Sequence, residues 1–395
     1  MPPSIRPRAL PRGLASLVLL LAGAAMAAEM KVTLVRPLES AAADFGVSAV
    51  PCGSDLLISG YTESNDIDSA LLLRVGPSGD AVWRQTWPAG KDGAIWALRP
   101  VGDGTFAGAG WTTSAAGDLD AMLLRVGPDG HALWRRTYPG PGKERLWSVD
   151  VTPRGLVAAG EALAADGTSK MLVLRADLHG NEVARVALDG APVERAFSVQ
   201  ATADGGFALA GQSGSGPREG PGYDARIVRC DAAGKPIWSR TWGGPGFDVG
   251  HDLRRLDDEG FLVAGYTETG SGHGTDAMLL RLSAAGEVTW AHTEGGPGDD
   301  RAVHLDLLPD HDVAVAGYSR TAAGDWDIVL RVFSPDGAPR WERRFGGGSN
   351  ELGRTVVASP DGGLTVVGHS QSYGPSERIL LIRLRPREDT KGGGV

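Results

Sequence analysis

One unit recurs about every 50 residues along this chain and restricts its fold more than any other feature. The pattern Gly-x-x-x-Trp occurs at Gly79–Trp83, Gly130–Trp134, Gly234–Trp238, Gly286–Trp290 and Gly337–Trp341, with a degenerate copy at Gly180–Ala184. A small residue followed by glycine occurs seven times, at Ser59-Gly60, Ala109-Gly110, Ala159-Gly160, Ala210-Gly211, Ala264-Gly265, Ala316-Gly317 and Val367-Gly368. Each unit contains four short apolar or alternating runs, and no window shows sustained helical periodicity. Seven such units predict an all-β fold, a seven-bladed β-propeller of four-stranded antiparallel blades.

The ends of the repeat array indicate how the ring closes. We place the blades at residues 44–87, 92–138, 144–188, 194–242, 248–294, 300–345 and 351–387, in a single domain over 29–389. The last unit stops after its third strand, and a spare apolar run, Lys31–Leu38, precedes the first unit. We expect residues 31–38 to pair with blade 7 as its outermost strand, because this closure removes exposed sheet edges. Residues 390–395 are expected to form a disordered tail.

The first 28 residues have the pattern of a cleavable secretory signal. Arg6, Arg8 and Arg12 precede an apolar run over 14–22, and small residues follow up to Ala28. The apolar run is too short for a permanent membrane anchor. We therefore expect a signal peptide over 1–28, a periplasmic or secreted mature protein, and no integral membrane segment after cleavage.

Charge and cysteine content narrow the classes of partner. The chain has 39 basic and 48 acidic residues, and removal of residues 1–28 leaves 36 and 48, a net charge of −12. This acidity argues against nucleic acid or an anionic membrane surface as partner. Cys52 and Cys230 fall in blades 1 and 4, too far apart for a disulfide, which needs Cα atoms within about 7 Å. We expect two unpaired, buried thiols and a monomeric protein.

An acidic residue opens nearly every unit. These residues are Asp44, Asp92, Glu144, Glu194, Asp248, Asp300 and Glu351. We expect them to accept hydrogen bonds from loop amides, as Asp residues do in turns. The alternative is a ring of carboxylates that binds a cation such as calcium; no other cofactor and no metal ligand is predicted.

The segment Arg229–Trp238, which reads RCDAAGKPIW, resembles the tryptophan-docking repeat of PQQ-like propellers. That family includes quinoprotein dehydrogenases and the scaffold protein of the outer-membrane barrel assembly machinery. Turns such as Asp204-Gly205-Gly206 are similar to those of bacterial secreted and periplasmic β-propeller repeat proteins. The resemblance implies a propeller fold, an exported location and a binding role. The quinoprotein redox activity is not implied, because this chain has seven units instead of eight and no adjacent cysteines.

The positions that differ between blades are the candidate binding residues. The start of the first strand carries Trp96, Trp147, Phe197, His251, Val303 and Arg354 in successive units. The loops between the second and third strands add Trp111, Arg218, Glu219, His273, Trp326 and Tyr373. In this strand order both sets emerge on one face. Three aromatic residues in adjacent blades would provide a stacking surface for a sugar, a peptide or a flat ligand. The alternative is that they fill the channel or the core between blades.

These observations lead to one function with two rivals. The first is an exported, non-catalytic propeller that binds a protein, peptide or glycan on its loop-rich face. The second is a carbohydrate-active hydrolase or lyase that uses paired carboxylates from Asp248, Asp300 and Glu351. The third and weakest is a PQQ-dependent quinoprotein. We assign no catalytic residue, because zinc-binding HExxH and nucleophile-elbow GxSxG patterns are absent from the sequence.

Overall fold

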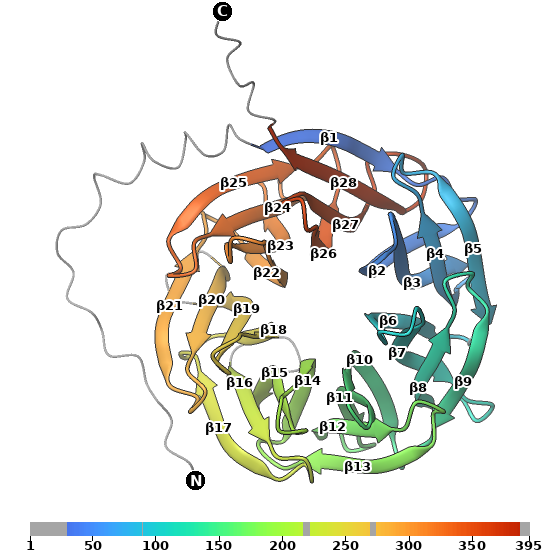
Figure 1. The fold of residues 1–395 in the computed structure, drawn as a ribbon, viewed down its shortest axis with the longest axis vertical. Coiled ribbons are helices and arrows are strands. Elements are labelled where there is room, and N and C mark those ends of the chain that lie inside the picture. The colour runs from blue at the N-terminus through green and yellow to red at the C-terminus, as the bar shows by residue number, and fades with distance from the viewer. Residues whose placement is uncertain (1–29, 89, 216–221, 269–273, 388–395) are drawn as a thin grey trace, which may run out of the picture.

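The computed structural model describes residues 30–88, 90–215, 222–268 and 274–387. Across these residues the strands form seven four-stranded antiparallel sheets arranged around a central axis (Figure 1). The described residues contain no helix, and so none that would span a membrane. The predicted all-β, seven-bladed propeller is confirmed.

All blades have the same strand order, with the first strand nearest the axis and the fourth at the perimeter (Figure 1). Blades 1 and 2 consist of β2 (Ala43–Cys52), β3 (Asp55–Ser64), β4 (Ile67–Val75), β5 (Ala81–Pro88), β6 (Gly93–Pro100), β7 (Phe106–Thr113), β8 (Leu119–Val126) and β9 (Ala132–Tyr138). Blades 3 and 4 consist of β10 (Lys143–Thr152), β11 (Gly155–Leu163), β12 (Ser169–Ala176), β13 (Glu182–Leu188), β14 (Val193–Ala201), β15 (Phe207–Gly214), β16 (Tyr223–Cys230) and β17 (Pro236–Trp242). Blades 5 and 6 consist of β18 (Val249–Arg255), β19 (Phe261–Thr267), β20 (Asp276–Leu282), β21 (Val288–Glu294), β22 (Asp300–Leu307), β23 (Val313–Arg320), β24 (Trp326–Phe333) and β25 (Pro339–Phe345). Blade 7 consists of β26 (Glu351–Ala358), β27 (Leu364–Ser370), β28 (Arg378–Pro386) and β1 (Met30–Pro37).

The ring is closed by the N-terminal strand, as predicted. β1 runs antiparallel to β28, with Met30 opposite Pro386 and Pro37 opposite Leu380. The Arg36 side chain crosses to blade 1, where Nη1 donates a hydrogen bond to the carbonyl oxygen of Ser78 at 3.0 Å. The N-terminal strand β1 and the C-terminal strand β28 are therefore paired, and β28 has no open edge.

The Gly-x-x-x-Trp pattern joins neighbouring blades at the perimeter. The Trp134 indole of blade 2 lies against Gly180 of blade 3, where a Cβ atom would come within 2.9 Å of the ring. Its Nε1 donates a hydrogen bond to the carbonyl oxygen of Leu178 at 2.9 Å. The φ angle of Gly180 is +79°, a conformation that favours glycine in a tight turn. The glycine is therefore needed both for the turn and for the close approach of the indole.

The cores lie between adjacent blades. Facing sheets bury mainly Leu, Val, Ile and Ala side chains, for example Leu123 of blade 2 against Leu146 of blade 3. Both thiols belong to these cores: Cys52 and Cys230 are buried and unpaired, as predicted.

Most of the acidic residues at the start of the blades accept hydrogen bonds from the loops that precede them in the sequence. Glu351 Oε2 accepts a hydrogen bond from the Gly347 amide at 2.6 Å, and Asp300 Oδ2 accepts one from Gly296 at 2.8 Å. Asp248 Oδ2 accepts one from Gly244 at 2.9 Å. Glu144 and Glu194 accept such bonds as well, so the predicted role is confirmed for five of the seven acids. Asp44 accepts instead from the Arg84 side chain and Asp92 from the Trp111 indole.

Candidate functional site: the mouth of the central channel

A β-bulge interrupts the innermost strand of every blade at the same position. In blade 3, Leu146 lies opposite Gly160 and Ser148 opposite Ala159, so that Trp147 between them has no partner on β11. A bulge of this kind redirects the side chain of the extra residue. The seven unpaired residues are Val47, Trp96, Trp147, Phe197, His251, Val303 and Arg354.

The glycine repeated within each second strand makes the bulge possible. A Cβ atom on Gly160 would lie 1.7 Å from the carbonyl oxygen of Arg145, which is two residues before the bulge. The corresponding distance is 1.8 Å for Gly211 and 1.8 Å for Gly317. No side chain fits there, because the carbonyl oxygen occupies the space. The sevenfold glycine therefore marks the seven bulges.

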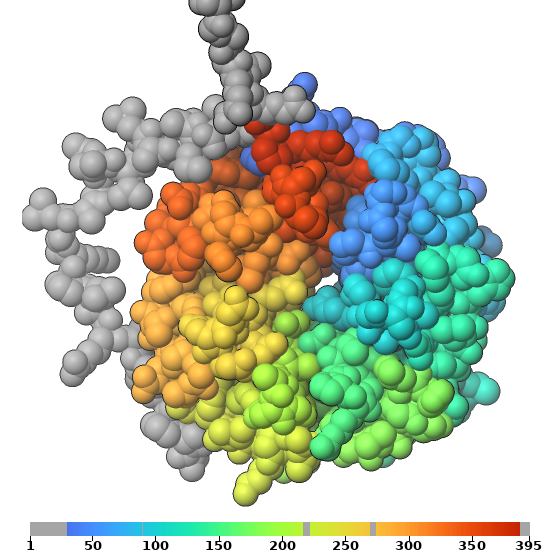
Figure 2. Space-filling view, viewed as in Figure 1, coloured from blue at the N-terminus to red at the C-terminus, as the bar shows by residue number. Residues whose placement is uncertain are grey.

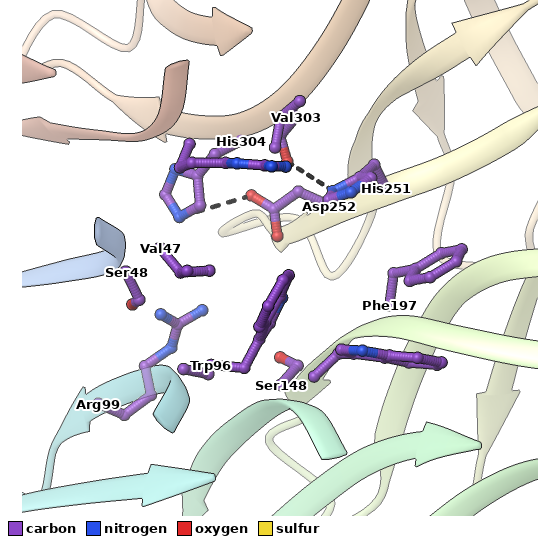
Figure 3. A pocket seen from close by; sticks show the side chains of 13 residues that line it. Val47, Ser48, Trp96, Arg99, Ser148, Phe197, His251, Asp252, Val303 and His304 are labelled. Atoms are coloured by element: carbon purple, nitrogen blue, oxygen red, sulfur yellow. Dashed lines mark hydrogen bonds and ion pairs between the residues drawn. The ribbon is translucent and has the colours of Figure 1, made fainter. Parts of the chain in front are cut away.

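The bulge residues converge on one small cavity on the central axis. All seven line it, and Figure 3 shows the Trp96 ring pointing into it, with Phe197 and His251 on neighbouring blades at its side. The space open to water-sized molecules is about 60 Å³, enough for a few waters. Figure 2 shows the blades packed closely around the centre of the molecule. The cavity is thus the floor of a shallow mouth, which we call the channel mouth.

Three aromatic rings form an arc on one side of the channel mouth. The ring centroids of Trp147 and Phe197 are 5.0 Å apart with an interplanar angle of 41°. Phe197 and His251 are stacked at 5.4 Å and 4°. Since these rings cover part of one another's faces, the arc presents mainly ring edges to the cavity. Two of the three predicted aromatic residues, Trp147 and Phe197, are thus brought together with His251, whereas Trp96 packs on Trp111 at 5.2 Å. The rings do not form a flat open platform.

Residues next to the bulges lock the blades to each other under the arc. Asp252 accepts hydrogen bonds from the Ser198 hydroxyl at 2.9 Å and from the Leu305 amide at 3.0 Å, which joins blades 4, 5 and 6. The His304 Nε2 lies 3.9 Å from Asp252 Oδ2 (Figure 3). Although burial opposes ionisation, His304 and Arg254 hold the pKa of Asp252 below its ordinary value. Asp252 is therefore a charged carboxylate whose hydrogen bonds hold the three blades together.

His251 is a neutral group in this site. Burial, and to a smaller extent the Arg354 guanidinium, lowers its pKa to about 4. Its Nδ1 lies 2.9 Å from the carbonyl oxygen of Val303, so Nδ1 carries the proton (Figure 3). The Nε2 atom is then an acceptor only, and His251 contributes apolar ring surface with one acceptor atom.

Two arginines supply positive charge to the channel mouth. Arg354 lies with its guanidinium carbon 5.8 Å from the centre of the Tyr318 ring, and Arg99 extends into the cavity from blade 2 (Figure 3). Arg99 has a distant ion pair with Asp150, at 4.0 Å. Within the described part of the chain, no carboxylate lies at ion-pair distance from Arg354. The mouth therefore combines apolar rings with a guanidinium that lies over the Tyr318 ring. Burial raises the pKa of Glu377, and the Arg354 guanidinium is near enough to that carboxyl group to offset part of the rise.

The predicted loop residues take different places on the same face. Trp111 is buried, packs on Trp96 at 5.2 Å and donates from Nε1 to Asp92 at 2.7 Å, so it supports the Trp96 ring. Trp326 lies edge-on to Tyr318 at 5.1 Å. Tyr373 is exposed and lies outside the cavity lining. Arg218, Glu219 and His273 lie outside the described residues.

Val47 and Arg99 line the cavity but were not predicted from the sequence. Val47 occupies the same bulge position as Trp96, so alignment of the seven units on their glycines would have found it. Arg99 lies three residues after the bulge, where the strand returns to regular pairing with β7. The repeat pattern does not indicate that the Arg99 side chain points into the channel.

The carboxylates proposed for glycoside cleavage are not available at the channel mouth. Asp248, Asp300 and Glu351 are at most 1% exposed and are hydrogen-bonded to loop amides. The cavity is also much smaller than the roughly 300–1,000 Å³ typical of cofactor sites, so it does not fit a tricyclic quinone. No group of three or more His, Cys, Asp or Glu residues in the described ranges is arranged to hold a metal ion.

Comparison with known proteins gives the fold and no family. The sequence matches none of the known protein-family profiles. It is 24% identical over 175 residues to the regulatory protein FlaEY of Caulobacter vibrioides, a match that covers 38% of this chain and 18% of that protein. The chain thus corresponds to less than a fifth of the length of that relative.

Solved structures of similar shape include two eukaryotic propellers. The WD40 domain of Neurospora crassa Pan2 has a TM-score of 0.56 and 12% identity, over 91% of this chain and 96% of that domain. Chaetomium thermophilum Sqt1, solved with the N-terminus of ribosomal protein L10 bound, has a TM-score of 0.50 and 10% identity, over 87% of this chain and 97% of Sqt1. At these identities the similarity is one of fold alone: this chain is a seven-bladed propeller that resembles WD40-type propellers.

Proposed function

We propose that this chain is an exported, non-catalytic propeller that binds a protein or peptide partner at the channel mouth. One observation carries the proposal: the seven bulges direct chemically different side chains to the same place. The hydrogen bonds and tryptophan contacts that build the blades recur from unit to unit, whereas the bulge position varies between Val, Trp, Phe, His and Arg. Variation at a position that faces a shared surface favours recognition over scaffolding.

The side chains favour a protein or peptide over a flat sugar surface. Trp and Arg are the residues that most often dominate the energy of protein interfaces. The stacked faces of Phe197 and His251 already cover each other, which leaves less open ring surface for a sugar. Arg354 has no carboxylate within ion-pair distance among the described residues. An acidic side chain or the C-terminal carboxylate of a partner would therefore form an ion pair with its guanidinium.

The size of the cavity indicates how the partner binds. Because about 60 Å³ admits only a few waters, the partner would cover the mouth and insert at most one small group. The Sqt1 propeller has been solved with a peptide from ribosomal protein L10, which supports the capacity of this fold to bind a peptide. That support concerns the fold and does not identify the partner of this chain.

The proposal is tested with two substitutions at the mouth and one matched control. The variants Trp147→Ala and Arg354→Met should each lower the yield of partner captured from a periplasmic fraction of the native host by about tenfold, the usual effect of losing a central contact. The control is Ile237→Ala, because Ile237 is 57% exposed on the outer strand of blade 4. Unfolding midpoints of all three variants show whether the fold is kept.

Two results would contradict the proposal. Equal capture by the wild type and by both folded mouth variants would exclude the channel mouth as the contact. Binding of a glycan that is lost in Trp147→Ala, with no captured protein, would replace the protein partner with a sugar.

Export is the second part of the proposal. It rests on the arginines, the apolar run and the small residues within 1–28, which lie outside the described residues. Fractionation of the native host should find a processed chain in the periplasm or medium. An unprocessed chain in the cytoplasm would contradict this part and leave the binding proposal intact.

A further inference from the structure

Blade 3 differs from the other six blades at the position opposite its opening acid. Two residues after the repeated glycine, six blades carry a hydroxyl side chain: Thr62, Thr112, Ser213, Thr267, Ser319 and Ser370. Blade 3 has Ala162 there, and Ala162 lies opposite Glu144 in the strand register. The outer strand of blade 3 also has small residues, since Ala184 replaces the docking tryptophan and Ala187 replaces a threonine found in four other blades.

The missing hydroxyl leaves one carboxyl oxygen of Glu144 without a partner. In blade 4 the Ser213 hydroxyl donates to Glu194 at 2.6 Å, and in blade 7 Ser370 donates to Glu351 at 2.6 Å. Glu144 Oε1 accepts a hydrogen bond from the Gly142 amide at 3.1 Å, but Oε2 is buried and has no hydrogen-bond partner. Glu144 is 1% exposed, so solvent does not compensate.

The arginine that could neutralise Glu144 is engaged elsewhere. In blade 1 the residue after the docking tryptophan, Arg84, donates to the opening acid Asp44 at 3.0 Å. The equivalent residue in blade 3, Arg185, pairs instead with Glu182 at 2.9 Å and donates to the carbonyl oxygen of Pro139 at 2.9 Å. Burial raises the pKa of Glu144, and the opposing effects of the Gly142 amide and of the Arg185 charge do not reverse that rise.

The small residues of blade 3 open a cavity in front of this carboxyl group. The cavity has a volume of about 480 Å³, and its apolar lining includes Ala162, Leu163, Leu172 and Ala187. Its polar lining includes Glu144 and two cations, Lys170 and Arg185, which are paired with Asp189 and Glu182 respectively. This volume is in the range of small-molecule sites, about 300–1,000 Å³. Because Gly142 and the loop after β11 form part of the wall, the cavity opens on the same face as the channel mouth and further from the axis.

We propose that the blade 3 cavity binds an organic cation, a primary ammonium group carried on a short alkyl chain. The ammonium would donate to Glu144 Oε2 and supply the positive charge that Arg84 supplies to Asp44 in blade 1. The alanine and leucine walls would cover the alkyl chain. Lys170, at the rim, is already paired with Asp189 at 2.5 Å, so its charge is compensated. This site is distinct from the channel mouth and does not depend on the function proposed there.

The proposal predicts a preference among ligands that differ only in their polar group. Titration calorimetry of the mature chain at neutral pH uses hexylamine, hexanol and hexanoate. Hexylamine should bind in a saturable way and at least about tenfold more tightly than hexanol, the difference expected of a charge-assisted hydrogen bond. Hexanoate should not bind. Changes in the NMR signals of the Ala162 and Ala187 methyl groups would locate the ligand.

Two variants separate the carboxyl group from the fold. Glu144→Gln should weaken hexylamine binding about tenfold, because the amide carries no charge. Ala162→Ser restores the hydroxyl found in the other blades, so it should weaken binding without lowering the unfolding midpoint. Glu63→Gln, an exposed position in blade 1, is the matched control and should bind as the wild type does. Equal binding of hexylamine and hexanol, unchanged binding in Glu144→Gln, or no saturable binding would each overturn the proposal.

Discussion

At the scale of single residues, glycine is placed where a backbone atom of a neighbouring strand leaves no room for a side chain. The glycine repeated within each second strand faces the carbonyl oxygen two residues before the bulge, as Gly160 faces Arg145. This contact explains why a residue with no side chain recurs in all seven blades. It also makes the glycine a local requirement for directing Trp147 into the channel.

Substitution of this glycine should therefore be severe. We expect Gly160→Ala to lower the free energy of unfolding by at least about 3 kcal/mol, because its Cβ would overlap a backbone oxygen that cannot move without breaking the sheet. Denaturant unfolding measures the change. Gly244→Ala is the control, since a Cβ there has no atom within 4 Å, and it should stay within about 0.5 kcal/mol. Equal effects of the two substitutions would refute the steric account.

The buried histidine of the arc should make stability depend on pH. The pKa of His251 falls from an ordinary 6.5 to about 4 on folding. Between these values the unfolded chain binds a proton that the folded chain does not, so stability decreases as pH falls. From pH 7 to pH 5 this amounts to about 2 kcal/mol at most. His251→Gln should reduce the loss of stability over that range, measured by denaturant unfolding at both pH values.

An exposed histidine provides the comparison for this pH effect. The His131 side chain is 88% exposed, so His131→Gln should leave the pH dependence of the wild type unchanged. If His251→Gln and His131→Gln lose stability equally between pH 7 and pH 5, the neutral state assigned to His251 is wrong.

At the scale of strands and turns, each blade is attached to the next at both its inner and outer ends. Near the axis, side chains beside the bulges bind the backbone of the next blade, as Ser148 does when it accepts from the Val199 amide at 3.1 Å. At the perimeter, the docking tryptophan covers the turn glycine of the following blade. Because both contacts recur, loss of either one should weaken a single interface.

The perimeter contact can be measured with one substitution. We expect Trp134→Ala to lower the free energy of unfolding by about 2–3 kcal/mol, because it removes ring packing on Gly180 and the hydrogen bond to Leu178. Val183→Ala on the neighbouring outer strand is the control, since Val183 is 63% exposed, and it should change stability by less than about 0.5 kcal/mol. A Trp134→Ala variant as stable as this control would show that the indole does not stabilise the interface.

Much of this element-level arrangement was predictable from the sequence. The spacing of Gly130 and Trp134 predicted the outer strand and its turn, and the apolar run over residues 31–38 predicted the strand that closes the ring. The bulges were not predicted, because one extra residue in a strand leaves the apolar pattern almost unchanged. Consequently Trp147 was expected at the start of the first strand, and the structure places it in the channel wall beside Phe197. The stacking of Phe197 on His251 depends on side-chain orientation and had no sequence signal.

At the scale of the whole molecule, the ring brings residues that are distant in sequence to one axis. Trp96 and Arg354 are separated by most of the propeller sequence and line the same cavity. The scaffold is repetitive, but the lining of the channel mouth is not, and blade 3, which departs from the repeat at Ala162 and Ala184, carries the cavity in front of Glu144. This division between uniform framework and variable surface is the basis of the binding function proposed for the chain.

Site-specific photo-crosslinking in the native host tests this account most directly. A photoreactive residue placed at Trp147, in the arc, is compared with one at Ile237, exposed on the perimeter of the adjacent blade. We expect a discrete protein adduct at Trp147 that is reduced by Arg354→Met and absent at Ile237. The same adduct at both positions, or an adduct at Ile237 alone, would show that the channel mouth is not the surface this propeller uses to bind its partner.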